Sequence, residues 1–357
     1  MRSEIACLVV THQMTAEAIP WMKRAREVFG RLVIFIDRHR ASADAERHAQ
    51  AVGAEVHFSD SAMFFASDFR AMVKACDSEW IFFLDHDEEL SPEWSDPSWR
   101  SILQNTEFTH FLCSRRWVLR SGNWIGSSPW WPDFQLRLFR ANSATRFPSK
   151  PHEPLAVAGP AALLRHLSIH HHIWLLDQPA RHAKAKFYDT LLPGGALDYF
   201  YLYEQFNLKE QQIPPPAAFD PRSDVVTMPR LDPAMVGAIG LEDGQVPERI
   251  GPGELFWPEA ILRNGAEATL VSAPGYPVRL SYHWRDAISG ATEVVDGLRT
   301  EIVDPIKPSE TRAVEYVVIS PARPGIFELE LTVVQEQNFW FEEVIPGFGK
   351  RFQIQVG

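Results

Sequence analysis

The segment Trp80–Leu90, with the sequence WIFFLDHDEEL, constrains the fold of this chain most strongly. Its first five residues are apolar, and the next five, DHDEE, include four carboxylates. A short continuous apolar run bounded by polar residues is typical of a strand buried on both faces of a parallel sheet. Open α/β sheets bind their ligands just beyond the carboxyl ends of such strands. The segment therefore predicts a buried strand that delivers carboxylates to a ligand site.

Asp85 and Asp87 are two residues apart, so on extended backbone both side chains would face one side. Two oxygen donors on one side suit Mg²⁺ or Mn²⁺, which keep positions open for substrate phosphate oxygens. An acidic loop that only ends the strand is the alternative, because D-x-D by itself is a weak motif. Glu88 and Glu89 are expected to be solvated or structural.

Apolar runs and helical patterns alternate along the first part of the chain. The predicted elements are strands at 5–10, 32–36, 55–58 and 80–84 and helices at 16–29, 43–52 and 68–75. This alternation predicts right-handed βαβ crossovers and a Rossmann-like, mostly parallel α/β sheet. Two further helices are predicted at 180–192 and 193–212.

Polar residues follow the other predicted strands as well. Thr11 and Gln13 follow the first strand, and Asp37 follows the second. All of them would lie on the same sheet edge as Asp85 and Asp87, which indicates a nucleotide-binding cleft. The chain has no GxGxxG after its first strand and no GxxxxGK[ST], which argues against a dinucleotide-binding enzyme and a P-loop enzyme.

The composition changes after residue 213. Pro214 begins a run rich in Pro and Gly that is unsuited to long helices or central strands. From Trp257 onward, short alternating segments separated by Pro and Gly predict an Ig-like β-sandwich. Near its end, Trp340 and its two phenylalanine neighbours either form a sugar-binding or docking patch or close the end of the sandwich. We therefore expect a domain over 1–213, a connector over 214–256 and a sandwich over 257–357.

Charge and cysteine content exclude several classes of protein. The 357 residues carry a net charge of −11 with a pI near 5.6, which argues against nucleic acid as a partner. The three cysteines are scattered, which favours a reducing compartment. The N-terminal apolar run is too short for a signal peptide, and no stretch approaches the ~18 apolar residues of a membrane span. We expect a soluble cytoplasmic protein. Peripheral association with the inner face of a membrane and homo-oligomerisation are both left open.

Four segments together resemble the nucleotide-sugar domain of family 2 glycosyltransferases, in the branch that decorates lipopolysaccharide cores and related glycans. They are IACLVVTH from Ile5, LVIFID from Leu32, EWIFFLDHDEEL from Glu79 and PDFQLRLFRANSATRFPSKPHEPL from Pro132. The last segment is similar to the D-x-x-x-R-L-F-R … F … H-E pattern of that branch, and the resemblance covers roughly residues 4–190. One departure is the loop DRHRASAD at 37–44, which lacks the usual glycine and adds two arginines and a histidine.

The resemblance implies a GT-A fold, a nucleotide-diphosphate sugar donor (a UDP-sugar is favoured), Mn²⁺ or Mg²⁺, and inversion at the anomeric carbon. It implies that Asp85 contacts ribose or the metal, that Asp87 binds the metal and that His152 is a third ligand. Asp133 matches the carboxylate expected to act as general base, and Glu153 is the second choice. The remaining nucleotide-sugar contacts are assigned to Thr11, Gln13, Asp37, Arg70 and Arg137. A lysine in the region of Lys184 would lie near the donor.

Aromatic and basic residues gather just before Asp133. Trp130 and Trp131 are flanked by prolines and are expected at the surface, where aromatic faces can stack on sugar rings. Arg116 can pair with a phosphate or carboxylate. This composition predicts a platform for a glycan or lipid-linked saccharide acceptor, with packing in a core as the alternative. The run His170–His172 cannot form a three-histidine zinc site alone, because at most two neighbours in a strand share a face.

Three functions remain in view. The leading one is a metal-dependent inverting glycosyltransferase of bacterial surface polysaccharide biosynthesis. A nucleotidyltransferase would normally carry a Gly-rich basic signature near its first strand, and residues 11–18 have none. A non-catalytic glycan-binding or assembly protein with a degenerate transferase domain is the third.

Overall fold

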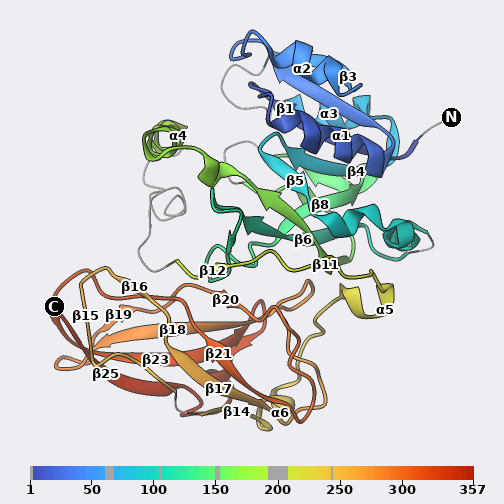
Figure 1. Cartoon of the computed structure of the whole chain (residues 1–357). Coiled ribbons are helices and arrows are strands. Elements are labelled where there is room, and N and C mark those ends of the chain that lie inside the picture. Colours follow the sequence, from blue (N-terminus) through green and yellow to red (C-terminus); the bar gives the residue numbers. More distant parts are fainter. Residues whose placement is uncertain (1–2, 61–67, 105, 149–152, 192–207, 243) are drawn as a thin grey trace. The chain divides into compact units, whose positions relative to one another are not determined.

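A mostly parallel sheet forms the centre of the first of two units, Met1–Val225, in a computed structural model of the chain (Figure 1). The model describes residues 3–60, 68–104, 106–148, 153–191, 208–242 and 244–357. The strand order is β13-β11-β6-β8-β4-β1-β2-β3, and β5 pairs with β11. Strand β8 runs antiparallel to both β4 and β6, whereas β1, β2, β3 and β4 are mutually parallel. The strands are β1 Ser3–Thr11, β2 Leu32–Asp37, β3 Glu55–Ser59, β4 Ser78–Asp85, β5 Glu88–Leu90, β6 His110–Trp117, β8 Gln135–Arg140, β11 Ala161–His171 and β13 Val225–Val226.

Helices connect these strands as the sequence pattern predicts. Helix α1 turns Met22, Ala25 and Phe29 inward and ends at Gly30, whose φ of 78° is a left-handed conformation that glycine adopts without strain. The helices are α1 Ala18–Phe29, α2 Ala45–Ala51, α3 Phe69–Ala75, α4 Gln178–Leu191 and α5 Pro221–Asp224, with 3₁₀ turns η2 Pro92–Ser95, η3 Pro97–Leu103, η4 Ala141–Ser143 and η5 Ile173–Leu175. Short strands complete the unit: β7 Trp124–Ile125, β9 Ala144–Arg146, β10 Ala156–Val157 and β12 Glu210–Gln211.

Strands β1 and β4 are buried on both faces. Alternate residues of β1 enter two separate cores, with Cys7 and Val9 in one and Leu8 and Val10 in the other. In the first core, Phe82 of β4 stacks on Phe29 with 4.6 Å between ring centroids. Continuous apolar sequence in these strands is thus explained by burial on both sides of the sheet.

The second unit, Val226–Gly357, is built from β-sheets. One sheet has the order β14-β17-β21, and a larger one has the order β15-β25-β23-β18-β19, with β20 on β18 and β24 on β23; β16 pairs with β22. Its strands are β14 Ile239–Glu242, β15 Arg249–Ile250, β16 Leu255–Phe256, β17 Glu259–Asn264, β18 Val278–Asp286, β19 Thr292–Val294, β20 Thr300–Glu301, β21 Thr311–Glu315, β22 Val318–Ile319, β23 Gly325–Gln335, β24 Phe339–Trp340 and β25 Lys350–Val356, with helices α6 Pro233–Val236 and α7 Phe341–Val344.

The predicted fold class, a mostly parallel α/β sheet followed by an all-β part, is confirmed. The boundary between the two units falls inside the segment 214–256, and that segment contributes α5, α6 and strands β13 to β16. Of the helix predicted at 193–212, residues 193–207 lie outside the described residues, and Glu210–Gln211 form strand β12 instead. Among the helices that the model describes, none is long and apolar enough to cross a membrane.

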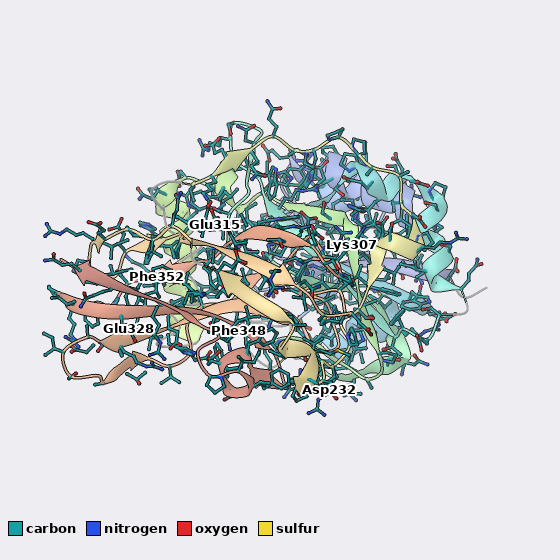
Figure 2. All side chains as sticks on the ribbon, turned by 90° about the horizontal axis from the view of Figure 1, so that it is seen from below. Asp232, Lys307, Glu315, Glu328, Phe348 and Phe352 are labelled. Atoms are coloured by element: carbon teal, nitrogen blue, oxygen red, sulfur yellow. The ribbon has the colours of Figure 1, made fainter. Side chains whose placement is uncertain are left out.

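The aromatic residues near the end of the second unit take part in packing. Phe341 is fully buried and contacts Phe348, labelled in Figure 2, with 5.2 Å between ring centroids. The Trp340 ring lies 4.7 Å from the His283 ring, and the Arg299 guanidinium lies 4.8 Å from its centre. These contacts favour the closing role over a sugar-binding face.

His283 is a source of pH-dependent stability in this unit. Its Nε2 lies 2.8 Å from Glu342 Oε1, and its Nδ1 contacts the Val295 carbonyl oxygen. Burial alone would lower the pKa of His283, but the Glu342 carboxylate outweighs it and the pKa is raised above its ordinary value. The protonated form is therefore the one that the folded unit stabilises.

We predict that wild-type protein is more stable than His283→Gln at low pH. This difference in the free energy of unfolding should fall as the pH rises above about 6.5 and through the raised pKa of His283. The difference should be roughly 1.5–3 kcal/mol below that window, the size of a hydrogen bond to a charged group, and should shrink above it. Urea unfolding of both proteins at several pH values measures it. A difference that stays constant or grows between pH 6 and pH 9 would contradict the assignment.

Candidate functional site

Polar residues of three parallel strands meet at one edge of the first unit's sheet. In the register of β1 with its neighbours, Val10 lies opposite Asp85, and Thr11 lies opposite Ile36, the residue before Asp37. Thr11 Oγ1 donates to the Gln13 carbonyl oxygen at 2.7 Å, and Asp37 Oδ1 accepts from the His39 amide at 3.1 Å. These contacts fix the loops that border the Asp85–Asp87 segment.

Each carboxylate of the D-x-D segment faces a cation. Asp85 Oδ2 accepts from Arg137 Nη2 at 2.9 Å, and the Asp85 side chain is 34% exposed. Asp87, 21% exposed, directs Oδ2 toward Lys184 Nζ at 3.6 Å and His171 Nε2 at 3.4 Å. Burial acts to raise the pKa of Asp87, but Lys184 and His171 hold it well below its usual range. Asp87 is therefore ionised at neutral pH.

Glu88 is the buried centre of the charges behind this segment. Its side chain is fully buried and accepts from Arg137 Nη2, from Arg115 Nη1 at 3.2 Å and from the Asp85 amide at 3.1 Å. Burial raises the pKa of Glu88 to about 7, and the Arg137 guanidinium opposes that rise. Of the two roles expected for Glu88, the model supports the structural one and excludes the solvated one.

Three hydrogen-bond donors hold the side chain of Asp133, and its backbone has a positive φ of 42°. Its Oδ2 accepts from Arg115 Nε at 2.6 Å and from Trp117 Nε1 at 2.8 Å, and its Oδ1 accepts from Gln135 Nε2 at 2.7 Å. Arg115 thereby joins Asp133 to Glu88. We call the linked series Asp85, Arg137, Glu88, Arg115 and Asp133 the carboxylate–arginine chain.

Further basic and imidazole groups surround Asp87. The His12 and His86 rings form an edge-on pair with 5.8 Å between centroids. Burial first, and then Arg40, lowers the pKa of His12 to about 4, so its imidazole is neutral. Arg40 stacks on Phe187 of α4 at 4.8 Å, one turn of the helix from Lys184.

Sequence reasoning did not assign these residues to the site. His12, Arg40 and His86 lie in the segments IACLVVTH, DRHRASAD and EWIFFLDHDEEL, and Lys184 is expected near the donor only through the resemblance. The available signal was the loop 37–44, DRHRASAD, in which two arginines and a histidine follow Asp37 directly. The contact of Lys184 with Asp87 joins residues nearly a hundred positions apart, which local patterns do not reveal.

The histidine run on β11 divides between different environments. His171 approaches Asp87, whereas His172 Nε2 lies 3.2 Å from Glu89 Oε2 and its ring stacks on Trp21 at 4.0 Å. His170 is buried, and burial lowers its pKa to about 4. Among the described residues, no three His, Cys, Asp or Glu side chains are grouped closely enough to hold a metal by themselves.

The predicted acceptor platform needs correction. Trp130, expected at the surface, is only 1% exposed. Arg116 is also buried: it donates to Ser168 Oγ at 2.7 Å, and its guanidinium lies beside the packed rings of Trp124 and Trp131, 5.6 and 5.5 Å from their centres. Neighbouring residues of a strand point to opposite faces, so Arg115 reaches Glu88 while Arg116 enters the core. Of the three proposed residues, Trp131 alone keeps partial exposure.

The remaining predicted residues have separate surroundings. Arg70 on α3 places its guanidinium 5.1 Å from the centre of the Phe147 ring. Glu153 Oε1 lies 3.8 Å from Arg146 Nη1. His152, the predicted third metal ligand, lies outside the described residues.

The donor chemistry at this edge fits a divalent metal. In the part of the chain that the model describes, the ion pairs of Asp85 and Asp87 each use Oδ2, which leaves Oδ1 of both residues for a ligand. Carboxylate oxygens are the donors that Mg²⁺ and Mn²⁺ prefer. Burial lowers the pKa of His171 to about 4, so a neutral imidazole lies beside Asp87 as well.

Comparisons with known proteins give fold likeness alone. No family model and no curated protein matches the chain. The solved structures with a partial likeness to this chain include the three that follow. Glucosyl-3-phosphoglycerate synthase from Mycobacterium tuberculosis, in complex with Mg²⁺ and uridine-diphosphate, is 17% identical with a TM-score of 0.26, over 34% of this chain and 45% of that one. A CARDB domain from Pyrococcus furiosus, in complex with di-metal ions, is 18% identical with a TM-score of 0.22, over 33% and 91%.

A beta-glucosidase from Listeria innocua is 14% identical with a TM-score of 0.24, over 33% of this chain. The match spans only 16% of the length of that enzyme. TM-scores of this size say nothing about the activity of this chain.

We predict that Glu88→Ala lowers the free energy of unfolding by about 3–5 kcal/mol, because Arg115 and Arg137 would be left buried without their shared partner. The control is Glu79→Ala, whose carboxylate is 55% exposed and pairs with Arg140, and whose loss should cost about 1 kcal/mol or less. Urea unfolding compares the two. Equal losses of unfolding free energy in the two variants would show that Glu88 is not the centre of the carboxylate–arginine chain.

Proposed function

We propose that this protein is a metal-dependent, inverting glycosyltransferase that moves a sugar from a nucleotide-diphosphate sugar to a glycan or lipid-linked acceptor. The observation that carries the proposal is the meeting of Asp85 and Asp87 with Arg137 and Lys184 at the carboxyl edge of a mostly parallel sheet. Carboxylates that can hold a metal, together with the cationic side chains beside them, match the charge of a nucleoside diphosphate.

The chemistry assigns a task to each group. A bound Mn²⁺ or Mg²⁺ would stabilise the charge that develops on the diphosphate leaving group, and Asp85 and Asp87 would hold it. Arg137 orients Asp85 through the 2.9 Å hydrogen bond. Thr11, Gln13 and Asp37 border the pocket proposed for the nucleoside, and Lys184 and Arg40 would bind phosphate oxygens.

The acceptor needs a general base, and the surroundings of Asp133 bear on its identity. Three donors, one of them the Arg115 guanidinium, occupy the Asp133 carboxylate. Accepting a proton there would break an ion pair, which favours Asp133 as a positioning residue. In this proposal Glu153 takes the role of base.

The biological setting is part of the same proposal. A lipid-linked or glycan acceptor would place the enzyme in the cytoplasm, at the inner face of the membrane, in bacterial surface polysaccharide biosynthesis. Trp131 is the remaining aromatic candidate for contact with the acceptor.

Metal-dependent nucleotide binding is the direct test. Isothermal titration of the full chain with UDP in the presence of Mn²⁺ should give binding that chelation of the metal weakens by at least roughly tenfold. For Asp87→Asn the metal-dependent part should be lost and turnover abolished, while the thermal unfolding temperature stays near wild type. The matched control Asp60→Asn, which removes an exposed carboxylate, should behave as wild type. UDP binding that is unaffected by metal would refute the metal role of Asp87.

The base assignment is tested by a second pair of variants. Donor hydrolysis is measured with the nucleotide sugar that a thermal-shift panel selects. Glu153→Gln should lower kcat by roughly 10²–10⁴-fold and leave UDP affinity unchanged. Asp133→Asn should lower the free energy of unfolding and leave a measurable rate. If Asp133→Asn alone abolishes turnover in a folded protein, Asp133 is the base.

A further inference from the structure

Lys184 forms an ion pair with Asp87, the carboxylate that would bind the metal in the proposed function. Its Nζ lies 3.6 Å from Asp87 Oδ2, the oxygen that also faces His171 Nε2. The side chain is 31% exposed, and its ammonium lies 5.9 Å from the centre of the Tyr188 ring. Lys184 comes from α4, whereas Asp87 follows β4, so two separate elements close this ion pair (Figure 1).

We propose that Lys184 is a built-in counter-ion of Asp87 that a divalent cation displaces, and that the released ammonium then binds the diphosphate of the donor. This inference rests on the proposed function, because it concerns the same metal and nucleotide. It adds that metal and nucleotide binding are coupled through Lys184. Without metal, the Lys184 ammonium balances the charge of Asp87. With metal bound, the same ammonium contacts the diphosphate of the donor.

Electrostatic repulsion makes the Lys184 ammonium and a metal ion compete for Asp87 when no anion is bound. An ammonium and a divalent ion beside one carboxylate repel each other, and this repulsion is strong where the side chains are largely shielded from water. Asp87 is mostly shielded, since its side chain is only 21% exposed. Metal binding at Asp87 therefore requires either that the ammonium moves away or that an anion arrives between the two cations.

The side chain of Lys184 is suited to such a move. Lysine carries its charge on a flexible four-carbon stem, so the ammonium can shift by several ångströms while the helix stays in place. The cation that pairs with Asp85 is different. Arg137 is buried and also pairs with Glu88, so its guanidinium is fixed. The mobile cation thus belongs to Asp87, and the fixed cation belongs to Asp85.

A diphosphate would remove the conflict. Its negative oxygens can bind the metal and the released ammonium together, so Mn²⁺ and nucleotide should each strengthen the binding of the other. By thermodynamic linkage this coupling is reciprocal and can be measured from either side. Loss of the ammonium should abolish most of the coupling, and should make the metal alone bind more tightly.

The experiment compares wild type, Lys184→Met and the control Lys186→Met, which removes an exposed positive charge two residues further along the same helix. Free Mn²⁺ is followed by electron paramagnetic resonance, and UDP binding by calorimetry. Lys184→Met should bind Mn²⁺ alone roughly five- to tenfold more tightly than wild type and bind UDP with Mn²⁺ more weakly. Lys186→Met should match wild type in both measurements.

Opposite changes for metal and nucleotide are the signature of the counter-ion. If Lys184→Met binds Mn²⁺ no more tightly than wild type, while Mn²⁺-dependent UDP binding persists in wild type, the inference is overturned and the proposed function stands. If Lys186→Met tightens Mn²⁺ equally, the effect is one of net charge and the inference is likewise overturned. Absence of Mn²⁺ binding in all three proteins overturns both.

Discussion

The burial of the Glu88 carboxylate between Arg115 and Arg137 is the interaction on which the site depends. A buried charge is tolerated only with close partners, so this one requires both arginines to turn inward at the end of β4. The same arginines donate further hydrogen bonds, Arg115 to Asp133 and Arg137 to Asp85. The positions of two candidate site carboxylates are therefore set by a third that no solvent reaches.

The site combines a rigid part with an adaptable part. In the carboxylate–arginine chain, the buried Arg137 guanidinium binds Glu88 and Asp85 together, which fixes Asp85. Asp87 lies just beyond the strand and shares its charge with Lys184 and His171 from later segments of the chain. A site of this kind can change its counter-ions at Asp87 without disturbing the sheet that supports it.

The strands of the first sheet could largely be predicted from the sequence, whereas several contacts of the candidate site could not, for physical reasons. Apolar runs placed the strands up to β4, with ends that shift by two residues or fewer, because burial on both faces leaves a continuous local signal. The contacts of Lys184 and Glu88 depend on long-range pairing, which no local pattern encodes. Trp130 was misplaced because prolines beside a tryptophan do not determine its burial. Arg115 and Arg116 differ in fate through strand alternation alone.

We propose above that Asp85 and Asp87 hold a divalent metal that binds a nucleoside diphosphate. A crystal structure of the full chain grown with Mn²⁺ and UDP tests it most directly. The account predicts an anomalous manganese signal within about 2.3 Å of a carboxylate oxygen of Asp87, with the diphosphate bound to it. Diphosphate bound at this edge with no manganese at Asp87, or manganese bound elsewhere in the chain, would contradict the account.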